Sequence, residues 1–206
     1  FNHFKLLNEY EVTNSTFFHF LTAIRETYKK VPYHNWRHAV DVTQFLAYEL
    51  SSDCFNGVFT KFELYALFVA AVCHDANHDG FSNVFNEKAE TPLGILFKNQ
   101  SVMETHHCSV AIEILSRDDC NMFEQFDSAD FKQIWTTVIE LILGTDMARH
   151  FDVVKSAKEL TESNSFDLEN KDHRLLLMKV LLKCADISNV ARPFELADKW
   201  CDVLCE

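Results

Sequence analysis

One apolar run dominates the hydrophobic pattern of the chain: all ten positions of residues 64–73 are apolar or small. The run is too short to cross a bilayer, and a T-x-x-E capping box begins just before it at Thr60. We therefore predict a helix that is buried on all sides. His74, Asp75 and His78 follow the run, so this helix should carry polar side chains at its C-terminal end.

A second strongly apolar helix is predicted over residues 175–186, and it also ends in an acid, Asp186. An unpaired buried carboxylate destabilises a protein by on the order of several kcal/mol, so each acid needs a partner. Taken alone, a pair such as His74-Asp75 is more often a solvated part of a surface loop. The second acid-terminated helix and the further histidines described below favour a bound metal ion instead.

The remaining pattern predicts shorter amphipathic helices. The first has Asn14 or Ser15 as its expected N-cap and is ended by Pro32. Its expected apolar face consists of Phe17, Phe18, Leu21, Ile24 and Tyr28. Further helices are expected after an Asn35 N-cap, from Thr91-Pro92, over residues 101–116 and over residues 127–143, with a polar loop over residues 161–171.

The composition is that of a helical globular protein. The 206 residues are 48% hydrophobic and include only four Gly and three Pro, and so few breakers favour helices over short strands. The length allows one domain or at most two small ones. The chain does not begin with Met and stops at Cys205-Glu206 within a helical pattern, so we expect it to be a piece of a longer protein.

Net charge and cysteine content indicate which partners and which cellular compartment to expect. The net charge of −12 disfavours a nucleic-acid partner, and the sequence contains neither a signal peptide nor a run suited to membrane insertion. Seven cysteines, an odd number without a C-x-x-C pair, indicate reduced thiols, with Cys73 and Cys184 expected in the core. We therefore expect a cytoplasmic protein.

Four residues could complete one metal site. They are His38, His74, Asp75 and Asp186. Two nitrogens and two oxygens suit zinc, and without a Cys ligand the set leaves positions open for water, as in catalytic sites. Asp75 has a second oxygen that could bridge to a harder ion, Mg²⁺ or Mn²⁺. Taken alone, His38 would more often be a packed or capping histidine.

Two further pairs of polar residues are placed to face one another. His34 lies four residues before His38, so the two imidazoles can lean toward one site. Glu104 and His107, three residues apart, share a face of their helix, whereas His106 is expected to be exposed.

Five motifs occur in order along the chain: H-N-x-x-H at 34–38, H-D-x-x-H-x-G-x-x-N at 74–83, E-x-H-H at 104–107, T-D-M at 145–147 and D-x-S-N at 186–189. In order and spacing they closely resemble the catalytic domain of class I cyclic-nucleotide phosphodiesterases, a branch of the HD-domain metal hydrolases. The resemblance covers essentially the whole chain. It implies that residues 1–206 form a single, compact all-α catalytic domain that lacks the C-terminal helices of the family. Two positions depart from the family pattern, because Thr105 replaces the usual Asn and Gly144 replaces the usual Ala.

The resemblance implies a role for each matching residue. The four candidate ligands would hold a zinc-like ion, Asp75 would bridge to a second metal, and His34 would be the proton donor. Residues that match positions holding metal-bound waters or orienting His34 are His78, Asn83, Glu104, His107, Thr145 and Asp146. Residues at or near positions that line the family's nucleotide pocket are Tyr33, Met147, Ile187, Asn189, Trp200 and Leu204.

The implied function is hydrolysis of 3',5'-cyclic nucleotides, cyclic AMP or cyclic GMP, to 5'-nucleoside monophosphates. Two divalent ions would stabilise the anionic phosphodiester and lower the pKa of a bridging water, so that hydroxide attacks phosphorus in line. His34 would be the general acid, because the pKa of histidine lies near neutrality. The longer protein would carry, past Glu206, a glutamine that binds the purine and a Phe that clamps the base, with regulatory domains elsewhere.

Two alternative functions remain open. An HD-type nucleotidase or deoxynucleoside triphosphohydrolase would share the four ligands but needs neither the H-N-x-x-H histidine nor the D-x-S-N tail. A non-catalytic metal-binding or nucleotide-binding module would be expected to have lost ligands, and none is lost here.

Overall fold

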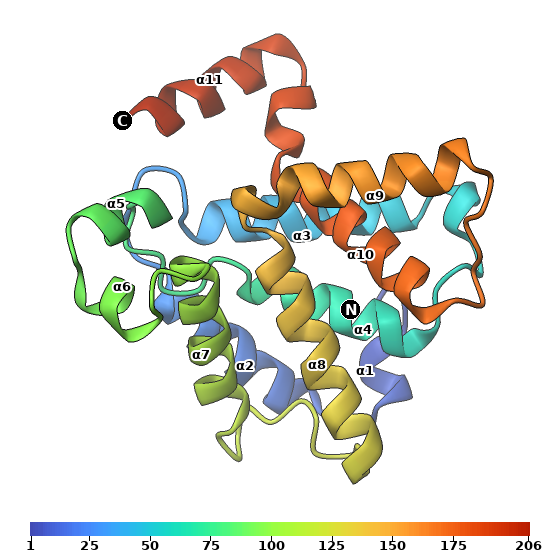
Figure 1. The fold of residues 1–206 in the computed structure, drawn as a ribbon. Coiled ribbons are helices and arrows are strands. Elements are labelled where there is room, and N and C mark those ends of the chain that lie inside the picture. Colours follow the sequence, from blue (N-terminus) through green and yellow to red (C-terminus); the bar gives the residue numbers. More distant parts are fainter.

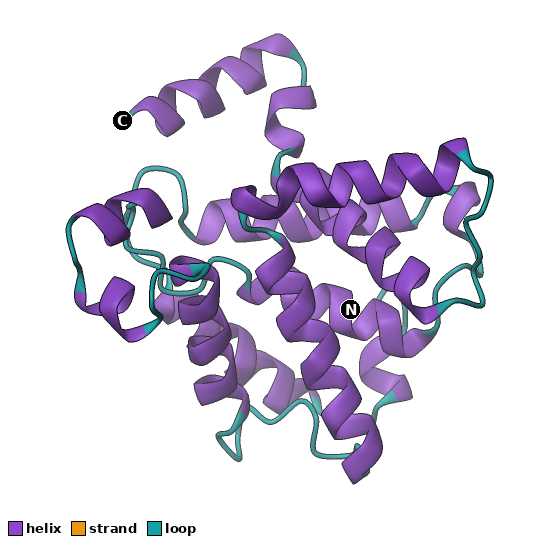
Figure 2. Ribbon diagram, viewed as in Figure 1, coloured by secondary structure: helices purple, strands orange, loops and turns teal.

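A computed structural model describes residues 1–206 as eleven α-helices and three short 3₁₀ helices, with no strand (Figure 1 and Figure 2). The all-α prediction is confirmed. The helices are α1 (Leu6–Glu9), α2 (Asn14–Thr27), α3 (Trp36–Leu50), α4 (Lys61–Cys73), α5 (Asn83–Lys88), α6 (Pro92–Leu96), α7 (Val102–Leu115), α8 (Ser128–Gly144), α9 (His150–Glu162), α10 (Lys171–Asp186) and α11 (Phe194–Cys205). The 3₁₀ helices are η1 (Asp53–Phe55), η2 (Met147–Arg149) and η3 (Ser188–Ala191).

Helix α4 is the core helix, as predicted. Every residue from Leu64 to Cys73 is buried, and the capping box between Thr60 and Glu63 is formed. Because α4 is apolar on all sides, other helices must cover it, and it packs against α3, α8 and α10. Even its one polar core side chain is satisfied, since Tyr65 donates from its hydroxyl to the Met122 carbonyl at 2.8 Å.

Helices α4 and α10 run side by side in the same direction. Near their N-terminal ends, Arg174 Nε donates to Glu63 Oε1 at 2.6 Å. At their C-terminal ends, His74 Nε2 lies 3.3 Å from Asp186 Oδ1. The two most apolar helices therefore deliver their terminal polar residues to the same place.

The predictions for α2 are partly wrong. Its N-cap is Thr13, whose hydroxyl accepts the Thr16 N–H at 3.0 Å, and it ends at Thr27, so Pro32 lies in the following loop. On its predicted apolar face Phe18 is 67% exposed, whereas Phe20, which was not assigned to that face, is fully buried. Phe20 lies four residues before Ile24, the other buried residue of α2, so the two side chains share one face of the helix.

The other predicted helices occur, with three corrections. The caps at Asn35 and Thr91 are confirmed. Helix α9 was not predicted, and none of its residues is buried. The core position expected for Cys184 is wrong, since that side chain is exposed, whereas Cys73 is buried as expected. The predicted polar loop is shorter at its N-terminal side, because α9 continues to Glu162.

Helix α11 stands apart from the other helices (Figure 1). None of its residues is buried, and Phe194 is 80% exposed. It meets the rest of the chain through Trp200, whose ring centre is 5.6 Å from that of Tyr33. None of the helices combines the length and the apolarity that are needed to cross a membrane.

Candidate metal centre

The four predicted ligands come from three helices that meet at one end of the core. His38 lies in the first turn of α3, where the Asn35 side chain accepts the Arg37 N–H at 2.9 Å and caps the helix. The Asn35 amide also donates to the carbonyls of Val31 and Pro32, at 3.0 and 2.8 Å. The turn that carries His34 is thereby fixed to the start of α3.

The ligand atoms of the four residues converge closely. His38 Nε2 and His74 Nε2 are 3.3 Å apart. Asp186 Oδ1 lies 2.9 Å from His38 Nε2 and 3.3 Å from His74 Nε2. Asp75 Oδ2 lies 3.4 and 3.2 Å from the same two nitrogens. All four ligand atoms, from His38, His74, Asp75 and Asp186, fall within 4.8 Å of one another.

These separations fit one metal ion. Ligand atoms at about 2.0–2.2 Å from zinc lie about 3.3–3.6 Å apart at tetrahedral angles and about 2.8–3.1 Å apart at right angles. The observed separations span those two ranges. Asp75 Oδ2, which faces the Nε2 atoms of both histidines, is a buried polar atom without a hydrogen bond. Because buried polar atoms are rarely left unpaired, the donor set fits a cation bound among these residues.

Hydrogen bonding prepares the His74 ring for coordination. His74 Nδ1 lies 2.8 Å from the Ala71 carbonyl oxygen, which can only accept, so the proton sits on Nδ1. In the neutral ring, Nε2 then has a free lone pair directed at His38, Asp75 and Asp186.

Charge within the cluster shifts the pKa of its members. Burial opposes ionisation of Asp75, but His74 and His38 hold the pKa of that carboxyl well below its usual range. Burial also opposes ionisation of Asp186, but the same two histidines lower the pKa of its carboxyl. At His74 burial is likewise outweighed, because Asp75 and Asp186 raise the pKa of the imidazole well above its usual value. The two carboxylates therefore stay ionised at neutral pH and attract a cation.

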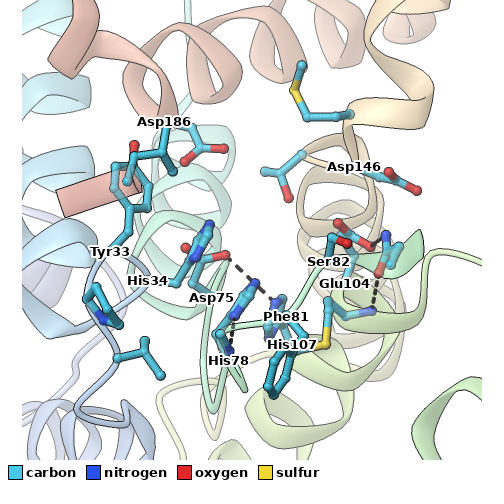
Figure 3. Close-up of a pocket in the computed structure, with 18 of the residues that line it drawn as sticks. Tyr33, His34, Asp75, His78, Phe81, Ser82, Glu104, His107, Asp146 and Asp186 are labelled. Atoms are coloured by element: carbon cyan, nitrogen blue, oxygen red, sulfur yellow. Dashed lines mark hydrogen bonds and ion pairs between the residues drawn. The ribbon is translucent and has the colours of Figure 1, made fainter. Parts of the chain in front are cut away.

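A second group lies on the other side of Asp75, as Figure 3 shows. His107 Nε2 is 3.7 Å from Asp75 Oδ1, and His107 Nδ1 donates to the Ala76 carbonyl at 2.7 Å. His78 Nδ1 accepts the Gly80 N–H at 2.9 Å, so a neutral His78 carries its proton on Nε2. Burial lowers the pKa of His78 to about 3 and that of His107 to about 4. Both rings are therefore neutral at pH 7. His78 Nε2 can donate a hydrogen bond, and His107 Nε2 can accept one.

His34 lies beside the four-residue cluster and outside it. Its ring stacks on His78, with ring centres 3.9 Å apart and planes at 7°. Burial lowers the pKa of His34, while the nearby Asp75 carboxylate opposes this shift. His34 and His38 are only four residues apart, one in the turn before α3 and the other in its first turn. Even so, only His38 belongs to the ligand cluster.

The opposite wall of the site is a hydrogen-bonded polar network. Asn83 donates from its amide to Glu104 Oε2 at 2.8 Å and accepts the Met103 N–H at 2.9 Å. Burial raises the pKa of Glu104. Asp146 accepts the Ser101 hydroxyl and the Ala148 N–H, each at 2.8 Å.

The sequence analysis missed two residues that hold this wall in place. Ser101 holds the Asp146 carboxylate, and Lys183 donates to the main-chain carbonyls of Thr145 and Asp146 at 3.1 and 3.4 Å. The hydroxyl of Thr145 itself donates to the Ile142 carbonyl at 2.8 Å. No local pattern reveals these contacts, because both Ser101 and Lys183 bond to groups distant in the sequence.

A cleft of about 670 Å³ opens over the cluster. Of the residues expected to bind substrate, Tyr33, Met147 and Leu204 line it. The other three do not: Asn189 donates from its amide to the Tyr33 hydroxyl, Trp200 packs on the Tyr33 ring, and Ile187 is 41% exposed outside the cleft. Asn189 and Trp200 therefore contact Tyr33, which itself lines the cleft.

Comparison with known proteins places these features in context. The sequence profile of the family described as 3'5'-cyclic nucleotide phosphodiesterase matches residues 33–206. A curated mouse relative, the "High affinity cGMP-specific 3',5'-cyclic phosphodiesterase 9A", is 38% identical over 202 residues, which are 98% of this chain and 37% of that protein. The Dictyostelium discoideum "3',5'-cyclic-nucleotide phosphodiesterase regA" is 34% identical over 201 residues, 97% of this chain and 25% of that protein.

A solved structure agrees with these matches. The phosphodiesterase domain of the rhodopsin phosphodiesterase fusion protein from the choanoflagellate Salpingoeca rosetta superimposes with a TM-score of 0.95 at 34% identity. The match covers 99% of this chain and 65% of that one. The chain thus spans a quarter to somewhat over a third of the two curated relatives, and about two thirds of the solved domain.

Proposed function

Because the chain belongs to the 3'5'-cyclic nucleotide phosphodiesterase family, we propose that its metal centre serves the hydrolysis of 3',5'-cyclic nucleotides to 5'-nucleoside monophosphates. The observation that carries this proposal is the convergence of two imidazoles and two carboxylates on an open cleft. Asp75 and Asp186 both line that cleft, whereas a structural zinc site would be closed by its four protein ligands. We also propose that residues 1–206 belong to one catalytic domain, of which they form the part that carries the metal centre.

Two kinds of metal position are supported by the donor atoms. His38, His74, Asp75 and Asp186 would hold zinc or a similar ion. The second oxygen of Asp75 would bind Mg²⁺ or Mn²⁺. The neighbouring side chains of His78 and His107 would hold water molecules beside that ion. Two divalent ions bound there would offset the charge of a phosphodiester and lower the pKa of a water, so that hydroxide can attack phosphorus.

The remaining polar residues would orient that water and the phosphate. Neutral His78 offers a ring N–H, while neutral His107 offers a ring lone pair, so the two rings suit opposite ends of a hydrogen-bonded water. Glu104 and Asp146 supply carboxylate oxygens from the facing wall, and their positions are held by Asn83 and Ser101.

His34 would donate the proton to the leaving 3′ oxygen. It lines the cleft together with Asp75, it lies outside the ligand cluster, and its stacking on His78 limits how the ring can turn. Burial lowers its pKa, which makes the imidazolium form a stronger acid. An anionic phosphodiester beside the ring would favour that protonated form.

Tyr33, Met147 and Leu204 would contact the nucleoside part of the substrate, because they line the same cleft as His34. The printed names of the relatives differ in substrate: the mouse protein is called cGMP-specific, and the Dictyostelium protein is named for cyclic nucleotides in general. Both cyclic GMP and cyclic AMP are therefore substrates to test.

A side-by-side assay tests the proposal. The purified protein, loaded with zinc and supplied with Mg²⁺ or Mn²⁺, is offered cyclic GMP, cyclic AMP, a deoxynucleoside triphosphate and a 5'-nucleoside monophosphate. We expect turnover of a cyclic nucleotide only, with 5'-monophosphate as the product. Preferred release of triphosphate or of inorganic phosphate would support the alternative HD-type hydrolase, and metal binding without any turnover would support a binding module.

A further inference from the structure

Lys183 is a buried lysine whose ammonium forms no ion pair. It lies on α10 one helical turn before Asp186, and only 4% of the residue is exposed. Lysine is almost never buried unless it is paired. Lys179, one turn earlier on the same helix, has the usual arrangement, with Nζ 2.7 Å from Glu140 Oε2. A buried ammonium without a carboxylate partner therefore calls for an explanation.

The partners of Lys183 are main-chain carbonyls at the metal centre. Its Nζ donates to the carbonyls of Thr145 at 3.1 Å and Asp146 at 3.4 Å. These two residues connect α8 to η2 and both line the cleft. Lys183 thus ties α10, which carries Asp186, to the segment that presents Asp146 on the opposite wall.

The same segment is held from its other side by α7. The Ser101 hydroxyl, at the start of α7, donates to Asp146 Oδ2 at 2.8 Å. Helix α7 also carries Glu104 and His107. Through Lys183, Asp146 and Ser101, the helix that carries Asp186 is therefore linked to α7, which faces the second oxygen of Asp75 through His107.

We propose that Lys183 is a positioning residue for the second metal ion: its ammonium holds the Thr145-Asp146 main chain against α10 and so sets the separation of the two walls. This inference rests on the proposed function only in assuming a second ion beside Asp75. Lys183 would not touch the substrate. The contacts it makes would act through the groups on the 145–146 segment that hold the ion and its waters.

Three possible roles of Lys183 predict different changes in affinity. If the residue positions the wall, its removal weakens binding of the second ion. If it acts only as a nearby positive charge, its removal strengthens cation binding, because repulsion is lost. If it only fills space, metal affinity stays the same and the melting temperature alone falls. The sign of the change in affinity therefore separates the three.

The test is a Mn²⁺ titration of zinc-loaded protein, followed by electron paramagnetic resonance. For Lys183→Met we expect the dissociation constant for Mn²⁺ to rise by about 10-fold or more, as is typical when a residue supporting a metal site is lost. Lys183→Arg, which keeps the charge and the donors, should restore most of the affinity. Lys179→Met, the matched control, removes a lysine from the same helix and should leave the affinity unchanged.

Turnover provides a second measurement. The Mg²⁺ concentration for half-maximal activity should rise in Lys183→Met, while saturating Mg²⁺ restores kcat, which loss of folded protein would not allow. If Lys183→Met does not fold, Lys183→Gln is titrated instead and judged in the same way. Unchanged or tighter Mn²⁺ binding would overturn the inference, as would a wild-type protein that binds no Mn²⁺ beyond zinc. Because the titration needs no substrate, its result is independent of which nucleotide is hydrolysed.

Discussion

Carboxylates have different partners at the two ends of the α4–α10 pair. At the N-terminal ends, the Glu63 carboxylate is paired with the Arg174 guanidinium. Twelve residues further along each helix, from 63 to 75 and from 174 to 186, about 18 Å away, lie the carboxylates of Asp75 and Asp186. There no Arg or Lys forms an ion pair with either acid, and the only basic partners are histidines.

The difference between the two ends separates stability from function. At the Glu63 end the chain supplies its own cation, so the pair closes on itself and needs nothing from solution. At the Asp75 end the acids face an open cleft and are left to attract a cation from outside. Changes at the first end should therefore alter the free energy of unfolding, and changes at the second end should alter metal content and turnover.

The largest effect is expected from removing a ligand at the open end. Asp186→Ala should lose the zinc-like ion and all turnover, because the site has no spare protein ligand. Elemental analysis of the purified protein measures the metal content. Asp172→Ala, which removes an exposed acid from the first turn of the same helix, is the matched control and should keep both. Full metal content in Asp186→Ala would mean that the four-ligand assignment is wrong.

The next largest effect separates the two histidines around Asn35. His34→Ala should keep its metal and lose about 10²-fold to 10⁴-fold in turnover, the usual contribution of a positioned general acid. His38→Ala should lose the metal instead. Metal analysis and initial rates on the same samples measure both quantities, with the exposed His19→Ala as a control. Metal loss in His34→Ala together with retention in His38→Ala would reverse the roles.

The two ends should also respond to pH in different ranges when metal is removed. His78 and His107 have lowered pKa values of about 3 and about 4, so unfolded chains bind more protons below about pH 6.5 and stability falls as the pH drops toward 4. His74 acts in the opposite sense, because its raised pKa adds stability below about pH 6.5. The pKa of Glu63 is lowered, although burial opposes this. Its contribution to stability is therefore lost only as the pH falls below about 4.3.

The contribution of one histidine can be isolated by substitution. His107→Gln cannot titrate, so its free energy of unfolding should fall less than that of the wild type between pH 7 and pH 5. Urea unfolding of the metal-free proteins at both values gives the comparison. An equal or larger fall in the variant would show that His107 is not kept neutral by burial.

The smallest effect is expected at the closed end. Glu63→Gln keeps an acceptor for the helix cap but loses the charge that pairs with Arg174, and should destabilise the protein by about 1–2 kcal/mol. Metal content and kcat/KM should not change. Glu159→Gln, which breaks the exposed pair with Lys155, should cost less than about 1 kcal/mol. A loss of metal in Glu63→Gln would show that the two ends are not independent.

Sequence reasoning succeeded where the signal is local. The capping box at Thr60 and the Asn35 cap depend on neighbours within three residues, and both are present. The four candidate ligands were found because each lies at a helix end that follows or precedes an apolar segment. Their convergence is observed, while their role as ligands stays a prediction.

What sequence reasoning missed depends on tertiary contacts. Ser101 and Lys183 have unremarkable neighbours in the sequence, and their partners lie 45 and 38 residues away. Phe20 is an exception, because it lies four residues before the buried Ile24 and the helical period alone places it on the same face, whereas Phe18 is exposed. Ile187 was expected at or near the nucleotide pocket; it follows the last residue of α10, is 41% exposed and does not line the cleft.

The central claim is that the acids at the C-terminal ends of α4 and α10 bind one ion together with His38 and His74. X-ray absorption at the zinc edge, on protein carrying one zinc per chain, tests it most directly. We expect nitrogen and oxygen neighbours at about 2.0–2.2 Å, with the multiple scattering of two imidazoles and no sulfur. Sulfur neighbours at about 2.3 Å, or a spectrum unchanged in protein carrying Asp186→Ala, would contradict the account.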